Sequence, residues 1–245
     1  MITIVFPYFN NGKMLLRHIQ EWKQFKYPER WNVVIADDCS KQDPLSNYLG
    51  DLAHVPFHSV KAFEISTDIA WNQDGARNLC FHHVDNSWCV STDADHLLDS
   101  ISANHILEFV ATTIPLEPNH YYRFWRSNAN TPDQLIEKYH PNSYLIHSDL
   151  YWGIGGYEEK LAGFYGKDGN FRRRLELYGV DSGFLPEPIH LTRFSLDDIP
   201  DANTTEYGRK DSKYHVQKHE HAKRISLSTD KPTSWLNFNW RKLCG

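Results

Sequence analysis

Two aspartates stand one residue apart in the stretch "VSTDADHLLD" (90–99). Residues two apart at the end of a strand project to the same side, which would bring the carboxylates of Asp93 and Asp95 together. Such carboxylates repel each other unless a cation lies between them or one stays protonated. Hard oxygen ligands of this kind suit Mg²⁺ or Mn²⁺. The same residues could instead cap the segment that follows or occupy a solvated turn, and the pair alone does not decide.

Polar residues also end two other segments that have the apolar character of buried strands. Pro7 and Tyr8 close the run "ITIVFPYF", and Asp37 and Asp38 close the second strand, "WNVVIADDCS". Ligands of open α/β sheets bind outside the carboxyl ends of the strands. If these strands are parallel, their ends share one edge with the "DAD" pair, and we expect a ligand site along that edge.

Strand-like and helix-like segments alternate along the first hundred residues. Apolar, β-branched runs predict strands, and apolar residues at helical spacing predict the helices between them. This alternation indicates a doubly wound α/β sheet. The strands are expected at 2–9, 31–40, 57–65 and 87–95, and the helices at 12–25 and 72–84.

The second half of the chain has a different character. Strands are expected at 120–127 and 142–157, separated by a polar loop. A helix is expected at 168–179, since apolar residues recur at helical spacing and Gly179 stands at its end. Residues 195–232 are polar and predict a loop or short helices.

Composition limits the class of protein. With 40% hydrophobic and 23% charged residues, the chain is typical of soluble globular proteins. A formal charge of −5 argues against nucleic acid as a partner, and no apolar run approaches the ~20 residues of a membrane span. The first residues lack the basic segment of a signal peptide, and the four cysteines show no CxxC spacing. We therefore expect a cytoplasmic location, in the cell of origin or in an infected host.

Five stretches, taken in order, carry a resemblance to a known family. They are "TIVFPYFN", "VVIADDCS", "WNQDGARN", "STDADH" and "GIGGYEEKLAGFYGKDGNFRRRL". Together they resemble the family 2 glycosyltransferases of the GT-A fold. The resemblance implies a GT-A-type, Rossmann-like sheet that is mixed but mainly parallel and flanked by helices. It also implies one domain over 1–245, made of a nucleotide-sugar-binding half (1–98), an acceptor-binding and catalytic half (99–194) and a C-terminal loop or helix extension (195–245).

The same resemblance assigns roles on the donor side. Pro7 and Tyr8 would line the pocket for the nucleotide base. Asp38, or else Asp37, would accept a hydrogen bond from the base. Arg77, in "GARN", would face the nucleotide or its diphosphate.

The resemblance also implies a divalent cation, Mn²⁺ or Mg²⁺, that bridges the diphosphate of the donor. Asp93 and Asp95 would bind this cation, and Asp93 would also bind the donor ribose. The family often adds a histidine as third ligand. His190 in "EPIHLTRF" is the main candidate, and His215, His219 and His221 are the alternatives.

The acceptor side centres on Asp168 in "GKDGNF". By resemblance it would be the base that deprotonates the acceptor hydroxyl, whereas its position alone fits a helix cap or a first-turn acid. Trp152, Gly156, Tyr165 and Lys167 would line the acceptor site, although aromatic residues here could equally pack in the core. Lys167 stands where the family often carries an acid.

These features predict an inverting, metal-dependent glycosyltransferase. It would move a sugar from a nucleotide-diphosphate donor, UDP-linked, to a hydroxyl of a carbohydrate or another acceptor. Two alternatives stay open. One is a nucleotidyltransferase, for which "PYFNNGKMLLR" is a poor match to a glycine-rich phosphate loop. The other is a non-catalytic module that binds sugar or nucleotide on the same fold.

Overall fold

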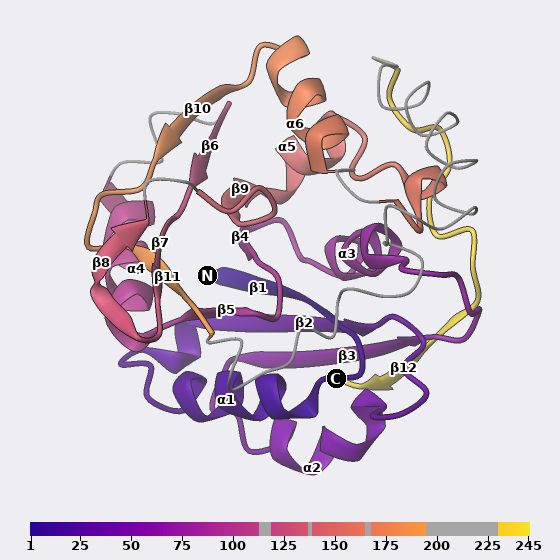
Figure 1. The fold of residues 1–245 in the computed structure, drawn as a ribbon, viewed down its shortest axis with the longest axis horizontal. Coiled ribbons are helices and arrows are strands. Elements are labelled where there is room, and N and C mark those ends of the chain that lie inside the picture. Colours follow the sequence, from indigo (N-terminus) through magenta and orange to yellow (C-terminus); the bar gives the residue numbers. More distant parts are fainter. Residues whose placement is uncertain (113–118, 137–138, 165–167, 195–229) are drawn as a thin grey trace.

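A computed structural model describes residues 1–112, 119–136, 139–164, 168–194 and 230–245 (Figure 1). These residues form an eight-stranded sheet and a four-stranded sheet. The strands are β1 (Ile2–Tyr8), β2 (Trp31–Asp37), β3 (Ser59–Ile65), β4 (Trp88–Ser91), β5 (His96–Leu98), β6 (His120–Arg123), β7 (Trp125–Asn128), β8 (Thr131–Ile136), β9 (Tyr144–His147), β10 (Asp181–Phe184), β11 (His190–Arg193) and β12 (Trp240–Cys244). The helices are α1 (Gly12–Trp22), α2 (Leu49–Leu52), α3 (Gln73–His82), α4 (Ser100–Thr112), α5 (Ser148–Gly153) and α6 (Asp168–Leu177), with short 3₁₀ turns at Pro28–Arg30, Leu45–Tyr48 and Glu159–Leu161.

The larger sheet has the strand order β10-β6-β9-β4-β1-β2-β3-β12. Strands β4, β1, β2 and β3 run parallel to one another, whereas β9 is antiparallel to β4 and β12 is antiparallel to β3. The expected α/β fold, mixed but mainly parallel and flanked by helices, is therefore confirmed. The central strands β1 and β2 are buried along nearly their whole length, because helices cover both faces of such a sheet.

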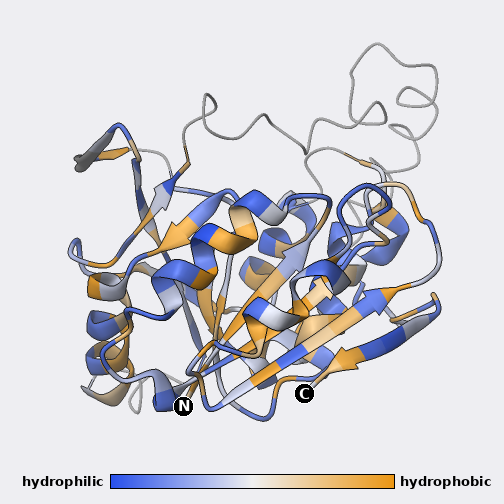
Figure 2. Ribbon diagram, turned by 90° about the horizontal axis from the view of Figure 1, so that it is seen from below, coloured by the Kyte–Doolittle hydropathy of each residue, from blue (hydrophilic) through white to orange (hydrophobic). Residues whose placement is uncertain are grey.

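Alternate residues of β1 pack into two separate hydrophobic cores, one on each face of the sheet. Phe6 packs with Leu15 and Trp22 of α1 on one face of the sheet, and Val5 packs with Leu79 of α3 on the other. Successive side chains of a strand point to opposite faces, so one short strand anchors both layers. Figure 2 shows the resulting pattern, with hydrophobic strands inside and hydrophilic helix surfaces outside.

The smaller sheet has the order β5-β11-β7-β8 and lies beside α4 (Figure 1). It begins immediately after the "DAD" stretch, since β5 starts at His96. Strand β11 is antiparallel to β5 and parallel to β7, with Arg193 opposite His96 and Leu191 opposite Arg126. This sheet therefore adds side chains to the edge where the parallel strands end.

Three expected elements differ in the structure. The strand expected at 142–157 ends at His147, and α5 follows it. After α5, glycines with positive φ form a turn. The strand expected at 120–127 is split at Phe124 between the two sheets. The end of the chain, expected to be loop or helix, forms strand β12 on the edge of β3. Helix α4 was not anticipated.

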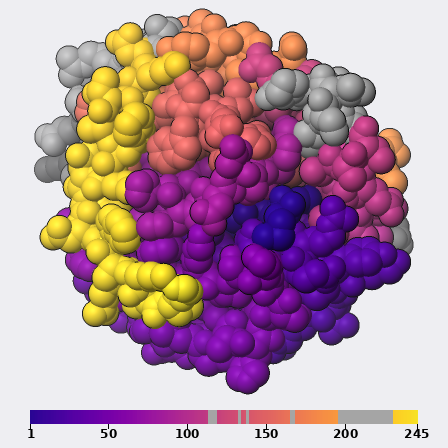
Figure 3. Space-filling model, turned by 180° about the vertical axis from the view of Figure 1, so that it is seen from behind, coloured from indigo at the N-terminus to yellow at the C-terminus, as the bar shows by residue number. Residues whose placement is uncertain are grey.

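The C-terminal segment runs along one face of the molecule (Figure 3, yellow). The Trp235 indole donates to the Gly155 carbonyl at 2.8 Å, and the backbone of Asn239 bonds Ser66 and Thr67. The segment thus ties the turn after α5 to the loop after β3. No helix in the described part of the chain is long and apolar enough to span a membrane.

Candidate active site

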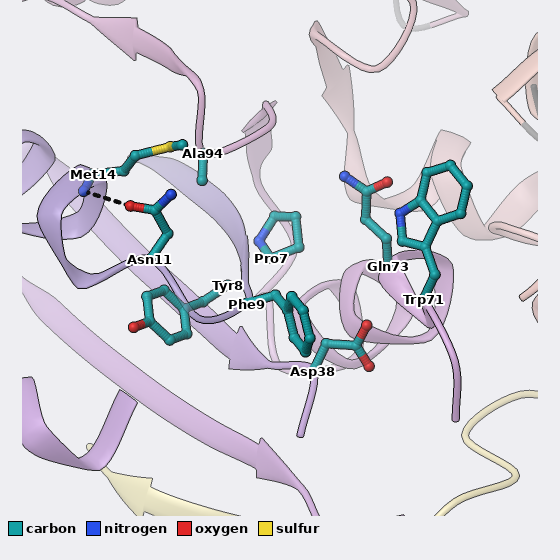
Figure 4. A pocket seen from close by; sticks show the side chains of 9 residues that line it. All are labelled: Pro7, Tyr8, Phe9, Asn11, Met14, Asp38, Trp71, Gln73 and Ala94. Atoms are coloured by element: carbon teal, nitrogen blue, oxygen red, sulfur yellow. Dashed lines mark hydrogen bonds between the residues drawn. The ribbon is translucent and has the colours of Figure 1, made fainter. Parts of the chain in front are cut away.

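A pocket of about 540 Å³, open to solvent, lies at the carboxyl ends of β1, β2 and β4 (Figure 4). The structure brings Pro7, Tyr8 and Asp38 together there, as expected from the sequence. Trp71 and Gln73, from the start of α3, form the opposite wall. The full lining is Pro7, Tyr8, Phe9, Asn11, Met14, Asp38, Trp71, Gln73 and Ala94.

The two aspartates at the end of β2, Asp37 and Asp38, have different surroundings. Asp37 is buried, and its carboxylate accepts hydrogen bonds from the Ser40 and Leu45 amides at 2.9 and 2.8 Å. Burial raises the pKa of Asp37, although these hydrogen bonds oppose the shift. Asp38 instead lines the pocket. Asp37 therefore stabilises the loop that follows β2, whereas Asp38 contributes to the wall of the pocket.

Asp93 points inward and is held by three polar side chains, and one of its carboxylate oxygens also lies 3.5 Å from Nε2 of His140. It accepts a hydrogen bond from Gln73 at 2.6 Å and one from Asn142 at 3.2 Å, and it forms an ion pair with Arg77. The side chain of Arg77 is fully buried and also lies over the Tyr157 ring, 5.3 Å from its centroid. Arg77 was expected to face the nucleotide or its diphosphate. In this structure its buried guanidinium instead pairs with the Asp93 carboxylate.

Asp95 instead lies with two histidines, His96 and His140. One ligand atom from each of the three lies within 4.8 Å of the others. His96 Nδ1 is 2.7 Å from an Asp95 carboxylate oxygen, and the two imidazole rings are 4.1 Å apart. One carboxylate oxygen and two imidazole nitrogens form a donor set that suits Mn²⁺ and similar divalent cations.

The protonation states of this group fit a metal site. Burial and the neighbouring His96 hold the pKa of His140 well below its usual value, which leaves its ring neutral. Burial alone would raise the pKa of Asp95, but the His96 hydrogen bond and the positive charge around it, including Arg193, lower it overall. His96 Nε2 is buried and has no hydrogen-bond partner among the described residues. A metal ion is one partner that would satisfy such a nitrogen.

The structure does not place His190 in this group. His190 opens β11 and lies three residues before Arg193, about 10 Å along a strand. An odd separation also turns its side chain to the face of the sheet opposite to Arg193 and its partner His96. The expectation of His190 as third ligand is thus replaced by His96 and His140. The other candidates, His215, His219 and His221, lie outside the described residues.

Asp168 is the first residue of α6, and 18% of its side chain is exposed. Its carboxylate lies 3.5 Å from Nη2 of Arg172, one turn further along the helix. Arg172 also donates a 2.6 Å hydrogen bond to the hydroxyl of Tyr139, the residue before His140. Asp168 is therefore both a first-turn acid and a carboxylate linked, through Arg172, to the segment that carries His140.

Trp152 and Gly156, which were expected on the acceptor side, are packed against other parts of the fold. Trp152 donates to the Phe81 carbonyl at 3.4 Å and is packed edge-on by Trp235. Gly156 has φ +60°, and a Cβ there would meet Asn78 at 2.9 Å, so the backbone requires glycine. Neither lines the pocket. Tyr165 and Lys167 lie outside the described residues.

Sequence reasoning missed His96, His140, Asn142, Trp71 and Gln73. His96 was in view as the last letter of "STDADH". His140 and Asn142 carried no signal, because they lie in the loop between β8 and β9 and reach the site through the fold of the second sheet. Trp71 and Gln73 stand in the stretch "WNQDGARN" that carries part of the resemblance, but neither had been given a role.

Comparison with known proteins gives three results. Residues 3–166, more than half of the chain, match the profile of the family described as "Glycosyl transferase family 2". No curated protein matches the sequence. Solved structures with a similar fold include Staphylococcus aureus TarS 1-349 in complex with UDP, at 13% identity and a TM-score of 0.64, over 80% of this chain and 61% of that one. They also include the mannosyltransferase PcManGT of Pyrobaculum calidifontis in complex with GDP-Man and Mn²⁺, at 15% identity and a TM-score of 0.62, over 82% and 58%. The chain thus spans less than two thirds of each of these proteins.

Proposed function

The chain belongs to glycosyl transferase family 2, and from this premise we propose that it moves a sugar from a nucleotide-diphosphate donor to an acceptor hydroxyl. The observation that carries the proposal is the continuity of the pocket with the Asp95 group. Ala94 lines the pocket, and the next residue, Asp95, belongs to the carboxylate-histidine group. A donor lying across Ala94 would place its base in the pocket and its diphosphate beside Asp95.

The pocket suits a nucleobase. Phe9 and Trp71 offer aromatic surfaces for stacking, and Asp38 offers a carboxylate that accepts from a base N–H. We propose uracil as the base. The TarS complexes with UDP and UDP-GlcNAc support this choice through shared fold, and the GDP-Man complex of PcManGT makes guanine the alternative to test.

Asp95, His96 and His140 would hold a divalent cation. We propose Mn²⁺, the cation present in the PcManGT complex of shared fold. When bound, the cation would stabilise the negative charge that develops on the leaving diphosphate. Asp93 serves the site differently from the original expectation. Held by Arg77, Gln73 and Asn142, it fixes the loop that presents Asp95.

Asp168 is the proposed base. The acceptor oxygen attacks the anomeric carbon while its proton passes to the Asp168 carboxylate, and the bond between that carbon and the diphosphate breaks. The products are the glycosylated acceptor and the nucleoside diphosphate. One displacement inverts the configuration at the anomeric carbon. Arg172 orients the carboxylate through its 3.5 Å contact.

A donor-hydrolysis assay tests the function. Wild type, Asp95→Ala and Asp168→Asn are incubated with UDP- and GDP-sugars and Mn²⁺, with Asp149→Asn, an exposed acid on α5, as control. We expect hydrolysis by wild type and the control, and loss of about 100-fold or more in the other two variants. If wild type neither binds nor hydrolyses any donor, the proposed function is wrong. If Asp168→Asn transfers sugar at the wild-type rate, another group is the base.

A further inference from the structure

Trp71, which forms one wall of the pocket, has an unusual backbone conformation. Its φ of +49° lies in the left-handed region, which a residue with a bulky side chain rarely adopts. Such a conformation is strained and persists only where the surrounding structure holds it. The contacts that hold the loop between β3 and α3, residues 66–72, therefore determine where this wall of the pocket lies.

The C-terminal segment, residues 235–239, holds the start of this loop. The Ser66 amide donates to the Asn239 carbonyl at 2.7 Å, and the Asn239 amide donates to the Thr67 hydroxyl at 2.9 Å. Strand β12 follows this segment directly and pairs with β3. The pairing of the two strands thus continues past the end of β3 into the loop.

A second set of contacts runs through Glu159. Its carboxylate accepts hydrogen bonds from two successive backbone amides of the C-terminal segment, those of Leu236 and Asn237, at 2.9 and 3.4 Å. Four residues further along, the Gly163 amide donates to the Trp71 carbonyl at 3.3 Å. The stretch from Glu159 to Gly163 therefore links the C-terminal segment to the backbone of Trp71 itself.

Phe238 supports the loop from its other end. It is 8% exposed and packs in the same hydrophobic core as the buried face of α3. A Cβ built on Gly75 would lie 2.6 Å from the Phe238 ring and 2.5 Å from the side chain of Asn72, so the first turn of α3 fits closely over both. Asn72 directly follows Trp71. The C-terminal segment thus contacts the chain on both sides of Trp71.

We propose that the C-terminal segment holds the Trp71 loop in place and thereby sets the affinity of the pocket for the nucleotide. Glu159 and Phe238 are positioning residues, because neither lines the pocket and both act through the loop. The effect on nucleotide affinity rests on the proposed function, whereas the hold on the loop does not. The match to the family ends at residue 166, so the C-terminal segment lies outside the matched region.

Hydrogen exchange of the full chain measures the hold on the loop without any ligand. We expect Glu159→Ala and Phe238→Ala each to speed amide exchange in residues 66–73 about 10-fold, with exchange in α1 unchanged. The two variants are independent, because Glu159 also accepts a hydrogen bond from Asn78 and Phe238 does not.

Each variant has a matched control. Glu158→Ala removes the neighbouring carboxylate, which accepts a hydrogen bond from the Lys160 amide. Phe25→Ala opens a cavity in the core on the other face of the sheet. Both controls should keep the wild-type exchange rate in the loop.

Calorimetric titration with UDP or GDP, each with Mn²⁺, measures the effect on the pocket. We expect Glu159→Ala and Phe238→Ala to bind nucleotide about 10-fold more weakly than wild type. Because both residues act through Trp71, neither substitution should weaken binding further when it is added to Trp71→Ala. A general loss of stability would not depend on Trp71 in this way.

The outcomes separate the inference from the function. If exchange in residues 66–73 is unchanged in both variants, the inference is overturned and the proposed function stands. If exchange rises but nucleotide affinity does not change, or the loss of affinity persists in the Trp71→Ala background, the positioning role is overturned. If wild type binds neither nucleotide, the proposed function fails, while faster exchange in both variants still supports the hold of the segment on the loop.

Discussion

At the scale of single residues, the neighbouring aspartates of the site differ in their partners. Asp37 accepts hydrogen bonds from two backbone amides and Asp93 pairs with Arg77, whereas Asp38 lines the pocket and Asp95 lies with His96 and His140. We propose that the first carboxylate of each pair stabilises the loop and that the second contacts the ligand. Sequence alone treats the members of each pair alike, because burial and partners distinguish them only in the folded chain.

The buried ion pair beneath the site gives a first prediction. Arg77→Met should lower the free energy of unfolding by about 3–5 kcal/mol, because Asp93 would keep its burial but lose its cation. Urea denaturation measures the change. Arg241→Met removes an arginine from an exposed pair with Glu64 and should cost no more than about 1 kcal/mol. Equal losses in the two variants would show that the Arg77 pair is not buried in solution.

A second prediction concerns His18, which is buried in α1 and lies 2.9 Å from the Ala94 carbonyl. Burial lowers the pKa of His18 to about 4. Protonation therefore favours the unfolded chain, in which the pKa is about 6.5. The contribution of His18 to stability is complete above that value and is lost as the pH falls toward 4, by about 3 kcal/mol in all.

The measurement compares urea denaturation of wild type and His18→Gln from pH 7.5 to pH 4.5 without added metal. Glutamine retains a donor for the Ala94 carbonyl but does not titrate. We expect the stability of wild type to fall more steeply over this range than that of the variant. Parallel curves would mean that His18 titrates normally and is accessible to water.

At the scale of elements, the glycine turn after α5 owes its sequence to backbone geometry. The resemblance placed Gly156 on the acceptor side, and in the structure its backbone closes against Asn78 and its carbonyl accepts a hydrogen bond from Arg174 of α6. The turn joins α3, α5 and α6 into one unit. Its glycines are required by backbone geometry and close packing.

A pair of glycine substitutions tests this role. Gly156→Ala should destabilise the protein by more than about 1 kcal/mol, since alanine is strained at φ +60° and its Cβ would meet Asn78 at 2.9 Å. Gly169→Ala, in the first turn of α6 with open space around it, should be neutral or stabilise by up to about 1 kcal/mol. Thermal unfolding distinguishes the two. Tolerance of alanine at both positions would contradict the close packing of the turn.

The second sheet is the element that sequence reasoning could not supply. Its strands are three to six residues long and come from three separate parts of the chain. Such short strands have no clear periodicity, and their register depends on partners distant in sequence. The placement of His96, Arg126 and Arg193 on one face, with His190 on the other, follows only once that register is known.

At the scale of the whole molecule, the order of the parallel strands determines where the chemistry lies. The runs at β1, β2 and β4 are apolar and β-branched, so sequence predicted both the strands and their common edge. Family membership was predicted from the ordered motifs and is confirmed. The antiparallel addition of β12 was not predictable, since nothing in "TSWLNFNWRKL" indicates the partner strand, and β3 supplies it.

Our central proposal is that one edge of this sheet binds a nucleoside diphosphate together with a divalent cation at Asp95, His96 and His140. Thermal unfolding with UDP or GDP, Mn²⁺, or nucleotide and metal together tests that claim most directly, because a ligand at about a hundred times its Kd adds about 2.7 kcal/mol of stability. We predict that nucleotide and Mn²⁺ together stabilise wild type and His190→Ala by more than the sum of their separate effects, and that Asp95→Ala and His140→Ala lose this excess. Absence of any stabilisation of wild type by nucleotide with metal, or an excess that survives in both Asp95→Ala and His140→Ala, would contradict the account.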